Sequence, residues 1–588
     1  MNASSLLSDA HRYLKQGSFQ DALRVGFAIL EAEPLNAQAL QVIALVRHQQ
    51  GLLDEADIYF RKSLGCEPMN PEVNFNYGNL LMHQGRSTDA VRCYRQCVEV
   101  GVKDPLLLCN LGAALGSIGE ITESIKTLRE CLAINPTIAE ARQSLASNLM
   151  LSGMTEEAIN EFKRAIDFKS GFYPNAEIGL LFCLTASDVR PMDEVYRAHL
   201  EWGKKTASLL PAYPAHFSIS REPERQLRIG IVSADLKEHS VAAFLEPLLE
   251  ASDRNDLDFF AYSETPLPDE VTGRLKGYFS VWRDVHGLAD HAWADLVRSD
   301  SIDVLIDLSG HTTGSRLRAF SLRAAPVQIS WLGYPNTTGL PQMDYRLADE
   351  LTDPSGIADR YYSEKLLRLS CGTWCFRARD GTPPVSPRII GRRPEIVFGS
   401  FNSVHKFNRP LIRLWARVLN SVPGSVFLLK AGALNDHGVR KFYRDMFIDE
   451  GILGERIIFA DYSQSMSEHL SNYGGVDVAL DSFPYAGTTT TFEALYMGVP
   501  VVTKRGQTHA SRVGASILSR LGRQGWIADS DDEYVAIAAA LASDSAGLAS
   551  VRKVLRAELE GSVLMDKNKF CAEFSRVIRS TWTEWCSR

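Results

Sequence analysis

The first 170 residues repeat with a period of 34, and this repetition constrains the fold more than any other feature of the sequence. Glycine recurs at this spacing five times, and alanine or serine fills a second set of five positions. A third slot is mostly proline, and a fourth holds only glycine or alanine. The four slots are Gly17, Gly51, Gly85, Gly119 and Gly153; Ala22, Ala56, Ala90, Ser124 and Ala158; Pro34, Pro68, Val102 and Pro136; and Ala44, Gly78, Gly112 and Ala146.

Each slot has a physical reason in a repeat made of two helices. Glycine permits the left-handed backbone conformation that ends the first helix, small residues let the helices cross closely, and proline stops the second helix. One pair cannot bury its apolar face alone, so successive pairs stack into a superhelix with a groove. This is the tetratricopeptide repeat (TPR) pattern, and it predicts five repeats over residues 1–171 and a helical adaptor over 172–222. We expect the groove to bind protein, with self-association into a homo-oligomer or a purely structural array as the alternatives.

Beyond the repeats, short β-branched runs alternate with helical stretches. The change falls at residues 211–224, and a proline-rich stretch at 381–394 divides the alternation into two sets. Alternation of this kind indicates parallel sheets covered by helices on both faces. The expected strands are 227–235, 256–264, 302–310 and 326–335 in the first set, and 395–403, 425–432, 456–461, 476–484 and 499–506 in the second.

The fold predicted for the whole chain is therefore an α-helical superhelix followed by two Rossmann-like α/β lobes. The lobes are expected over residues 223–385 and 386–560, with ligand sites at the carboxyl ends of their strands. Residues 561–588 are expected to form a helix whose Trp582 and Trp585 pack back on a lobe.

Composition and missing motifs exclude several classes of function. The net charge of -8 argues against a surface for nucleic acid. The chain has no apolar run of about 18 residues and its first residues do not resemble a secretory signal, so we expect a cytoplasmic protein without membrane insertion. The 10 cysteines include no CxxC, which predicts reduced thiols and no zinc site. No P-loop, GxGxxG after a first strand, HExxH or nucleophile elbow is present, which argues against an NTPase, a dehydrogenase, a zincin and an α/β-hydrolase.

The segment VDVALDSFPYAGTTTTFEALYMGVPVVT at residues 476–503 carries the most chemical information. A strand ends at Asp481, and four threonines that follow Gly487 open a helix. Hydroxyls and free backbone N–H groups at a helix N-terminus bind anions, above all phosphate. The alternative is an ordinary threonine helix cap. Glu493 is one turn into the helix, where it could reach ribose hydroxyls or simply favour the helix dipole.

The chain resembles the O-linked N-acetylglucosamine transferase family, which includes the plant SPINDLY fucosyltransferases and bacterial TPR-containing glycosyltransferases. The resemblance covers nearly the whole chain, and its motifs stand in the family's order. It implies a GT-B fold and an inverting, metal-independent transfer of sugar from a nucleotide diphosphate to protein. The motifs are SADLKEHSVAAFLEP, DVLIDLSGHTTGSR, AAPVQISWLGYPNTTGLPQMDY, FGSFNSVHKFNRP, the segment at 476–503 and HASRVGAS.

In the second lobe, the resemblance implies a site for the nucleotide sugar. Lys406 matches the lysine that contacts the diphosphate, where a cation would stabilise the leaving group in place of a metal. His469 matches a histidine beside the nucleotide base. Thr489 and Thr490 match phosphate-contacting threonines, and Gly487 and Thr488 belong to the same loop. The chain departs from the family at three positions: Thr488 replaces a frequent histidine, Glu493 replaces the aspartate of the animal enzymes, and Ser403, which shares a loop with Asn402, replaces their glutamine.

In the first lobe, the resemblance implies a role in catalysis. His239 matches a histidine long considered for catalysis, either as a base or for positioning, and a helix cap is its alternative. His311 is a second candidate, with an ordinary loop histidine as the alternative. A glycine-containing loop approaches the sugar in the family, and two residues start a helix near the second-lobe crevice. The loop residues are Gly333, Tyr334, Pro335, Thr337, Thr338 and Gly339, and the helix residues are His509 and Arg512, the latter a structural or phosphate contact.

The sequence Asp529-Ser530-Asp531 matches the DxD metal motif of another glycosyltransferase class, but it precedes a helix and indicates an acidic helix cap. We therefore expect no metal and no cofactor beyond the nucleotide-sugar donor. The predicted function is transfer of a GlcNAc-like sugar to Ser or Thr of a protein that the repeats recognise. The alternatives are a fucosyl-, nonulosonate- or Asn-glucosyltransferase of the same fold, for which flagellin is a plausible acceptor, a GT-B-like epimerase, or a catalytically silent TPR scaffold.

Overall fold

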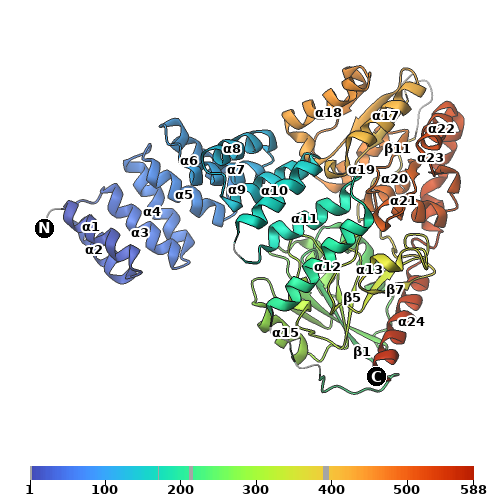
Figure 1. Cartoon of the computed structure of the whole chain (residues 1–588), viewed down its shortest axis with the longest axis horizontal. Helices are drawn as coiled ribbons and strands as arrows, with labels where there is room; N and C mark the ends of the chain where they lie inside the picture. Colours follow the sequence, from blue (N-terminus) through green and yellow to red (C-terminus); the bar gives the residue numbers. More distant parts are fainter. Residues whose placement is uncertain (1–2, 170, 211–212, 214–215, 388–395) are drawn as a thin grey trace. The chain divides into compact units, whose positions relative to one another are not determined.

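The structure, a computed structural model, describes residues 3–169, 171–210, 213, 216–387 and 396–588. The chain divides into two compact units, a helical array and an α/β unit that follows it (Figure 1). Parts of the two expected linkers, at 211–212, 214–215 and 388–395, lie outside the described residues. Among the described helices, no single one is long and apolar enough to cross a membrane; the bent pair 531–543 and 545–560 meets that test only when its two helices are taken together.

The described part of the array contains ten helices, which follow one another along the chain as five consecutive pairs. These paired helices confirm the predicted helical TPR array, while the exact number and bounds of the repeats stay a prediction. The pairs are α1 (Ala3–Lys15) with α2 (Phe19–Ala32), α3 (Ala37–Gln49) with α4 (Leu53–Cys66), α5 (Pro71–His83) with α6 (Ser87–Glu99), α7 (Pro105–Ser117) with α8 (Ile121–Ile134), and α9 (Ala139–Leu151) with α10 (Thr155–Phe168).

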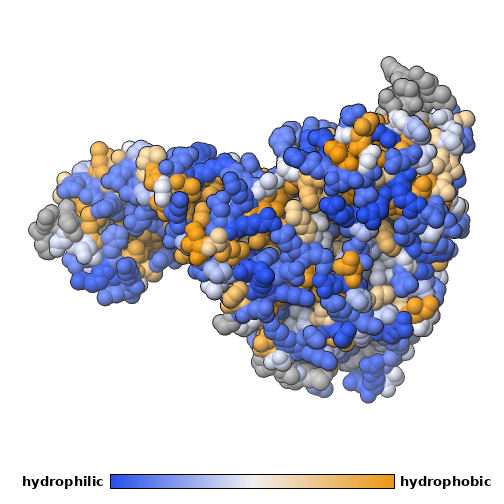
Figure 2. Space-filling model, turned by 45° about the horizontal axis from the view of Figure 1, so that its top comes forward, coloured by the Kyte–Doolittle hydropathy of each residue, from blue (hydrophilic) through white to orange (hydrophobic). Residues whose placement is uncertain are grey.

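The repeated slots have the conformations that the sequence predicts. All five glycines of the first slot have positive φ, between 72° and 84°, where other residues are strained. A Cβ at Gly78 would lie 2.5 Å from a ring carbon of Tyr94, and one at Gly112 would lie 2.5 Å from Cγ of Leu128. The helices therefore cross too closely there for a larger residue. Figure 2 shows hydrophobic residues interspersed with hydrophilic ones over the surface of the array.

A further slot at the same period was not predicted. The side chains of Asn36, Asn70 and Asp104 accept hydrogen bonds from backbone N–H groups at the starts of α3, α5 and α7. These residues are 34 apart and directly precede the first helix of a repeat, so they satisfy donors that the helix leaves unpaired.

The α/β unit begins with α11 (Pro174–Ala186) and α12 (Met192–Leu209) and continues into the first lobe. The seven strands of this lobe form a parallel sheet in the order β3-β2-β1-β4-β5-β6-β7. β3, β6 and β7 were not predicted from the sequence. The strands are β1 (Leu227–Ser233), β2 (Leu257–Ser263), β3 (Val281–Asp284), β4 (Val304–Asp307), β5 (Val327–Ser330), β6 (Tyr345–Ala348) and β7 (Lys365–Arg368), with helices α13 (Ser240–Ala251), α14 (Glu270–Lys276), α15 (Asp290–Ser299) and α16 (Leu317–Phe320).

The second lobe repeats this design with a six-stranded parallel sheet in the order β10-β9-β8-β11-β12-β13. Five of its strands were predicted, and the two-residue β13 was not. The strands are β8 (Val397–Ser400), β9 (Val426–Leu429), β10 (Ile457–Phe459), β11 (Val478–Leu480), β12 (Val501–Lys504) and β13 (Ile527–Ala528), with helices α17 (Arg409–Ser421), α18 (His437–Asp449), α19 (Met466–Ser471), α20 (Thr489–Tyr496), α21 (His509–Arg520), α22 (Asp531–Ser543) and α23 (Ser545–Glu560).

The last helix, α24 (Lys567–Cys586), leaves the second lobe and packs on the first. Trp582 is fully buried in the core of the first lobe, and its ring stacks on Trp585 with centroids 5.0 Å apart. The ring of Phe570 stacks on Trp331, which directly follows β5. This packing confirms the prediction that the C-terminal helix returns to a lobe.

In both sheets the strand order reverses direction at one point, between β1 and β4 and between β8 and β11. Loops that leave neighbouring strands at such a point diverge to opposite faces, and the space between them is where ligands bind in open α/β sheets. The loop after β8 contains Lys406, and the loop after β11 leads to the four threonines. The topology therefore brings together two motifs that are about 80 residues apart in the sequence.

Candidate functional site

Asn402 is at the centre of the polar group where β8 and β11 end. Its side-chain oxygen accepts a hydrogen bond from the Thr490 hydroxyl at 2.9 Å and one from the Lys406 ammonium at 3.4 Å. Its amide nitrogen donates to Asp481 at 3.3 Å. One buried amide thus links the loop after β8, the end of β11 and the first turn of α20.

Lys406 provides a cation at this point. Its Nζ donates to the carbonyl of Ala486 at 2.9 Å and lies 4.3 Å from the ring centroid of Tyr485. Burial lowers the pKa of Lys406 to about 8, although the charge of Asp481 acts in the opposite direction. Among the described residues no carboxylate forms an ion pair with Lys406, so its charge is available to an anionic ligand.

Asp481 shapes the loop that faces Lys406. One of its oxygens accepts hydrogen bonds from the backbone N–H groups of Ser482 at 2.9 Å and Gly487 at 2.7 Å, and the other accepts from the Thr503 hydroxyl at 2.8 Å. Burial raises the pKa of Asp481. Gly487 has no room for a side chain, because a Cβ there would lie 2.3 Å from the Thr490 hydroxyl oxygen.

The four threonines do not act as one simple cap. Thr488 precedes α20 but makes no side-chain capping hydrogen bond. Thr490 donates to Asn402, and Thr491 donates to the carbonyl of Gly487 at 2.9 Å. No hydrogen bond to the hydroxyl of Thr488 or Thr489 occurs among the described residues. The first turn of α20 therefore offers hydroxyls and N–H groups to an anion next to the Lys406 cation.

His469 and Glu493 also meet at this edge. Nε2 of His469 lies 3.1 Å from a carboxylate oxygen of Glu493, and its Nδ1 lies 2.6 Å from Nζ of Lys430. The rings of Phe401 and Tyr473 pack beside them with centroids 4.4 Å apart. Polar groups on an aromatic wall suit a planar heterocycle and its ribose. The second lobe thus gathers Lys406, His469, Gly487, the threonines and Glu493 in one place.

His239, at the corresponding edge of the first lobe, begins α13. Its Nδ1 accepts a hydrogen bond from the N–H of Val241 at 3.3 Å, which confirms the helix cap considered as its alternative role. The side chain remains 44% exposed, and Asp235 lies 3.7 Å from its ring. Desolvation lowers the pKa of His239, although Asp235 raises it. The imidazole is thus accessible to a substrate, and its part in catalysis stays a prediction.

His311 has a different environment from His239. Its side chain is fully buried, and its Nε2 lies 2.8 Å from the carbonyl oxygen of Thr338. The rings of Trp202, Tyr334 and His199 surround it, with centroid separations of 4.4, 5.1 and 5.3 Å. Burial lowers the pKa of His311 well below its ordinary value. The structure does not bring His311 to the surface with Lys406, and it places this histidine in the packing between the first lobe and α12.

The loop at 333–339 packs against its own unit at several points. A Cβ at Gly333 would lie 2.0 Å from the carbonyl oxygen of Leu308, and one at Gly339 would lie 2.0 Å from that of His199. Thr337 and Thr338 are buried and donate to the carboxylate of Glu364. These glycines permit close contacts with the backbone of neighbouring segments. Pro335 lines a cavity described below, while a contact of this loop with sugar stays a prediction.

The predicted helix cap is present at the DxD sequence, but the capping side chain is Ser530 and not an acidic residue. The hydroxyl of Ser530 accepts a hydrogen bond from the N–H of Glu533 at the start of α22. Asp529 pairs with Arg505 through two contacts of 2.6 and 2.8 Å, and Asp531 pairs with Lys504 at 2.6 Å. Both carboxylates therefore already have cationic partners.

Sequence reasoning missed several members of the site. Tyr485 is within the motif at 476–503, but nothing in its spacing indicates that its ring faces Lys406. Lys430 follows β9 by one residue, and only the strand order of the sheet shows that it reaches His469. Asp353 of the first lobe pairs with His509 of the second at 2.6 Å, a contact between residues 156 apart in the sequence.

The α/β unit, with two parallel-sheet lobes and a polar site at the switch point of the second, has the architecture of a GT-B glycosyltransferase. The family model described as Glycosyl transferase family 41 matches residues 195–375 and 386–574. The chain belongs to this family. A tetratricopeptide repeat model also matches residues 71–100 and 106–138.

Two curated relatives and one solved structure support this assignment. The chain is 36% identical over 398 residues to a tomato (Solanum lycopersicum) protein named "Probable UDP-N-acetylglucosamine--peptide N-acetylglucosaminyltransferase SPINDLY". This alignment covers 67% of the present chain and 42% of the tomato protein. It is 29% identical over 408 residues to the Arabidopsis thaliana protein of the same description named SEC, with 67% and 41% covered. The chain thus spans about two fifths of the length of the curated relatives it matches. A lysine-to-methionine mutant of Thermobaculum terrenum O-GlcNAc transferase is similar over 100% of this chain and 98% of its own, with a TM-score of 0.75 and 30% identity.

Proposed function

We propose that this protein transfers a GlcNAc-like sugar from a nucleotide diphosphate to Ser or Thr of a protein, with inversion and without a metal. The observation that carries the proposal is the position of Lys406 at the first turn of α20, with no carboxylate paired to it among the described residues. In such a transfer, the acceptor hydroxyl attacks the anomeric carbon and the sugar–phosphate bond breaks. Negative charge then develops on the departing diphosphate, where a preorganised cation and N–H dipoles stabilise the transition state.

The residues of the second lobe have distinct roles in this proposal. Lys406 and the N–H groups of Thr489 and Thr490 hold the diphosphate, while Asn402 and Asp481 fix the two loops that present them. His469 and Glu493 bind the nucleoside. His239 receives the proton of the acceptor hydroxyl or positions that hydroxyl, because its exposed ring is at the switch point of the first sheet. The names of the relatives support a peptide acceptor, and the repeats support its recognition as a polypeptide.

A donor panel tests the proposal. The protein is incubated with cell lysate and one of UDP-GlcNAc, UDP-Glc, GDP-Fuc or a nonulosonate donor, and peptides are examined for the mass of the added sugar. We expect addition of N-acetylhexosamine to Ser or Thr, without loss of activity in EDTA. Transfer from another donor, or to Asn, would replace the sugar or the linkage while keeping the class of reaction. No transfer from any donor would favour a silent scaffold.

A further inference from the structure

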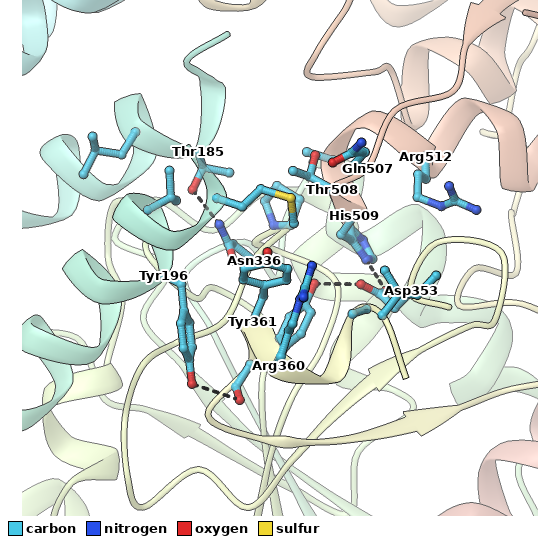
Figure 3. Close-up of a pocket in the computed structure, with 18 of the residues that line it drawn as sticks. Thr185, Tyr196, Asn336, Asp353, Arg360, Tyr361, Gln507, Thr508, His509 and Arg512 are labelled. Atoms are coloured by element: carbon cyan, nitrogen blue, oxygen red, sulfur yellow. Dashed lines mark hydrogen bonds and ion pairs between the residues drawn. The ribbon is translucent and has the colours of Figure 1, made fainter. Parts of the chain in front are cut away.

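A cavity of about 370 Å³ lies in the α/β unit where three parts of it meet (Figure 3). One wall comes from α11 and α12, another from the segments after β5 and β6, and the third from the first turn of α21. None of its lining residues belongs to the polar group around Lys406 and Asn402. This volume is within the range of sites for small ligands and can hold roughly two or three amino-acid side chains.

The charged lining of the cavity favours an anion. Asp353 is the single carboxylate among the described lining residues, and its charge is already matched. It pairs with His509 at 2.6 Å and accepts hydrogen bonds from the hydroxyls of Tyr362 at 2.8 Å and Thr352 at 2.9 Å. Burial alone would raise the pKa of Asp353, but His509, Arg346 and the Tyr362 hydroxyl together outweigh burial and lower it to about 2.

Two arginines of the lining have no carboxylate partner among the described residues. Arg512 donates to the carbonyls of Leu351 at 2.8 Å and Gly506 at 3.0 Å. Arg360 is exposed, and its guanidinium lies 4.7 Å from the ring centroid of Tyr361. A third arginine, Arg190, is different because it pairs with Glu156 and Glu194. A carboxylate that enters the cavity therefore finds two guanidinium groups whose charge no carboxylate among the described residues neutralises.

The rest of the lining suits a chain of mixed polarity. Tyr196 and Tyr361 form an edge-to-face pair with centroids 6.2 Å apart. Asn336 donates to the hydroxyl of Thr185 at 3.1 Å. The apolar part is formed by Leu184, Met192, Val195, Pro335, Pro354, Ile357 and Ala358. Apolar walls with a few placed polar groups are typical of a site that binds a side chain and the backbone next to it.

Hydrogen bonds join this cavity to the Lys406 group. The carbonyl of Ala510, a lining residue, accepts from the N–H of Ala486 at 3.0 Å, and the carbonyl of Ala486 accepts from Lys406 at 2.9 Å. In addition, Phe182 of α11 packs on Tyr485, the ring that faces Lys406, with centroids 6.2 Å apart. A polypeptide bound in the cavity therefore contacts a residue, Ala510, that is one hydrogen bond away from the loop that holds the lysine.

We infer that this cavity binds the acceptor polypeptide beside the modified hydroxyl, and that Arg360 and Arg512 select a segment that carries a carboxylate. The inference rests on the proposed function for the identity of the ligand as an acceptor. It assigns to α11 and α12, which connect the repeats to the first lobe, a direct role in binding the acceptor. It also places the determinant of acceptor charge in the α/β unit, apart from any recognition by the repeats.

The test uses the full chain and a scanned peptide. Fluorescein-labelled ten-residue peptides contain one serine and one leucine, with glutamate placed in turn at each position within four residues of the serine. A glutamine series is the reference. Binding is measured by fluorescence anisotropy without donor. We expect glutamate at one or two positions to tighten binding about five- to tenfold over glutamine, and this gain to shrink in high salt.

Variants of the protein locate the effect. Arg360→Gln is expected to remove the preference for glutamate, and Arg360→Glu to reverse it in favour of lysine at the same position. Arg413→Gln is the matched control, because Arg413 is an exposed arginine on α17 that does not line the cavity. The control is expected to keep the preference in full. Equal binding of all peptides, or a preference that survives Arg360→Gln, would overturn the inference.

Two further arms separate the inference from the proposed function. Free N-acetylglutamate is the competitor. If it displaces the labelled peptide at concentrations similar to those of the unlabelled peptide, the cavity binds a small carboxylate and not an acceptor polypeptide. The same peptides are then offered with the donor that supports transfer. Transfer without charge preference would contradict this inference and leave the proposed function intact. Charge-selective binding with no transfer from any donor would contradict the proposed function and leave a peptide site.

Discussion

The two lobes share one topology but make different use of the point where their strand order reverses. In the second lobe, Lys406, Asn402 and the first turn of α20 converge there. In the first lobe the two histidines of the same region separate, because His239 caps a helix at the surface and His311 is buried under α12. The reversal of strand order therefore creates a position where a ligand site can form. The side chains on the two flanking loops determine whether a site forms there.

This difference suggests a division of labour. A nucleotide diphosphate needs a cation and several donors in fixed positions, which the second lobe supplies. The first lobe supplies the accessible imidazole of His239 and a wall of the cavity lined by Arg360. Three changes test this division, taken from the largest expected effect on catalysis or donor binding to the smallest, and a fourth tests the burial of the first-lobe histidines.

Lys406→Ala should reduce kcat of transfer about a thousandfold, because a preorganised cation at the leaving group is lost. Single-turnover kinetics measure the effect, and thermal unfolding checks that the fold persists. Lys441→Ala is the control, since Lys441 is an exposed lysine on α18, paired with Asp445, outside the site. Transfer at the normal rate by Lys406→Ala would show that the second lobe does not hold the diphosphate at this residue.

His239 is tested with two replacements, since it caps α13 as well as facing solvent. Both His239→Ala and His239→Asn should reduce kcat about a hundredfold if the imidazole takes the proton. Only alanine should also lower stability, by about 1 kcal/mol, because asparagine is a good cap. The pH profile of kcat and the unfolding temperature are measured together. Full activity in His239→Asn would reduce the role of this histidine to that of a cap.

Thr489→Val should weaken donor binding about tenfold, because the variant loses a hydroxyl that makes no hydrogen bond to the described residues and belongs to the first turn of α20, where the diphosphate is proposed to bind. Isothermal titration with the nucleoside diphosphate measures the affinity. Thr583→Val is the control, since Thr583 is an exposed threonine on α24 whose hydroxyl bonds only to the carbonyl of Arg579 among the described residues. An unchanged affinity in Thr489→Val would leave the backbone N–H groups as the phosphate ligands.

The buried histidines of the first lobe should make the protein sensitive to acid without a direct effect on chemistry. Burial lowers the pKa of His199 to about 4 from an ordinary 6.5, so the unfolded chain binds the extra proton more readily. The free energy of unfolding keeps its full value above pH 6.5 and decreases as the pH approaches 4. His199 alone accounts for a decrease of about 3 kcal/mol. Thermal unfolding from pH 7 to 4 measures the change, and His199→Gln should show a smaller decrease. An equal decrease in both proteins would contradict this assignment.

The sequence was sufficient for the repeats and for most strands, because period and β-branched runs are local signals. It did not predict β6, whose residues Tyr345–Ala348 include a buried arginine, Arg346, that interrupts the apolar pattern. It also missed β13, where two residues pair with β12. In both cases the strand depends on its neighbours in the sheet and not on its own composition.

The same limit applies to the site. The motifs predicted which residues gather at the second switch point, because they lie in the two loops that follow β8 and β11. These strands are neighbours in the sheet, so the topology brings the two loops together. They did not show that Thr488 makes no cap or that Tyr485 lies beside the lysine. They also did not show that His311 is buried, because burial follows from the packing of α12, which is more than 100 residues earlier in the chain.

The return of α24 to the first lobe has a consequence for synthesis on the ribosome. Phe574, Val577, Ile578 and Trp582 belong to the same core as β1, which is made about 350 residues earlier. The first lobe cannot complete its core until α24 has left the exit tunnel, whereas the second lobe has all its strands and α17 to α23 before that moment. The second lobe can thus fold before the first lobe, although it is synthesised later. The first lobe stays incomplete while the second lobe is being made.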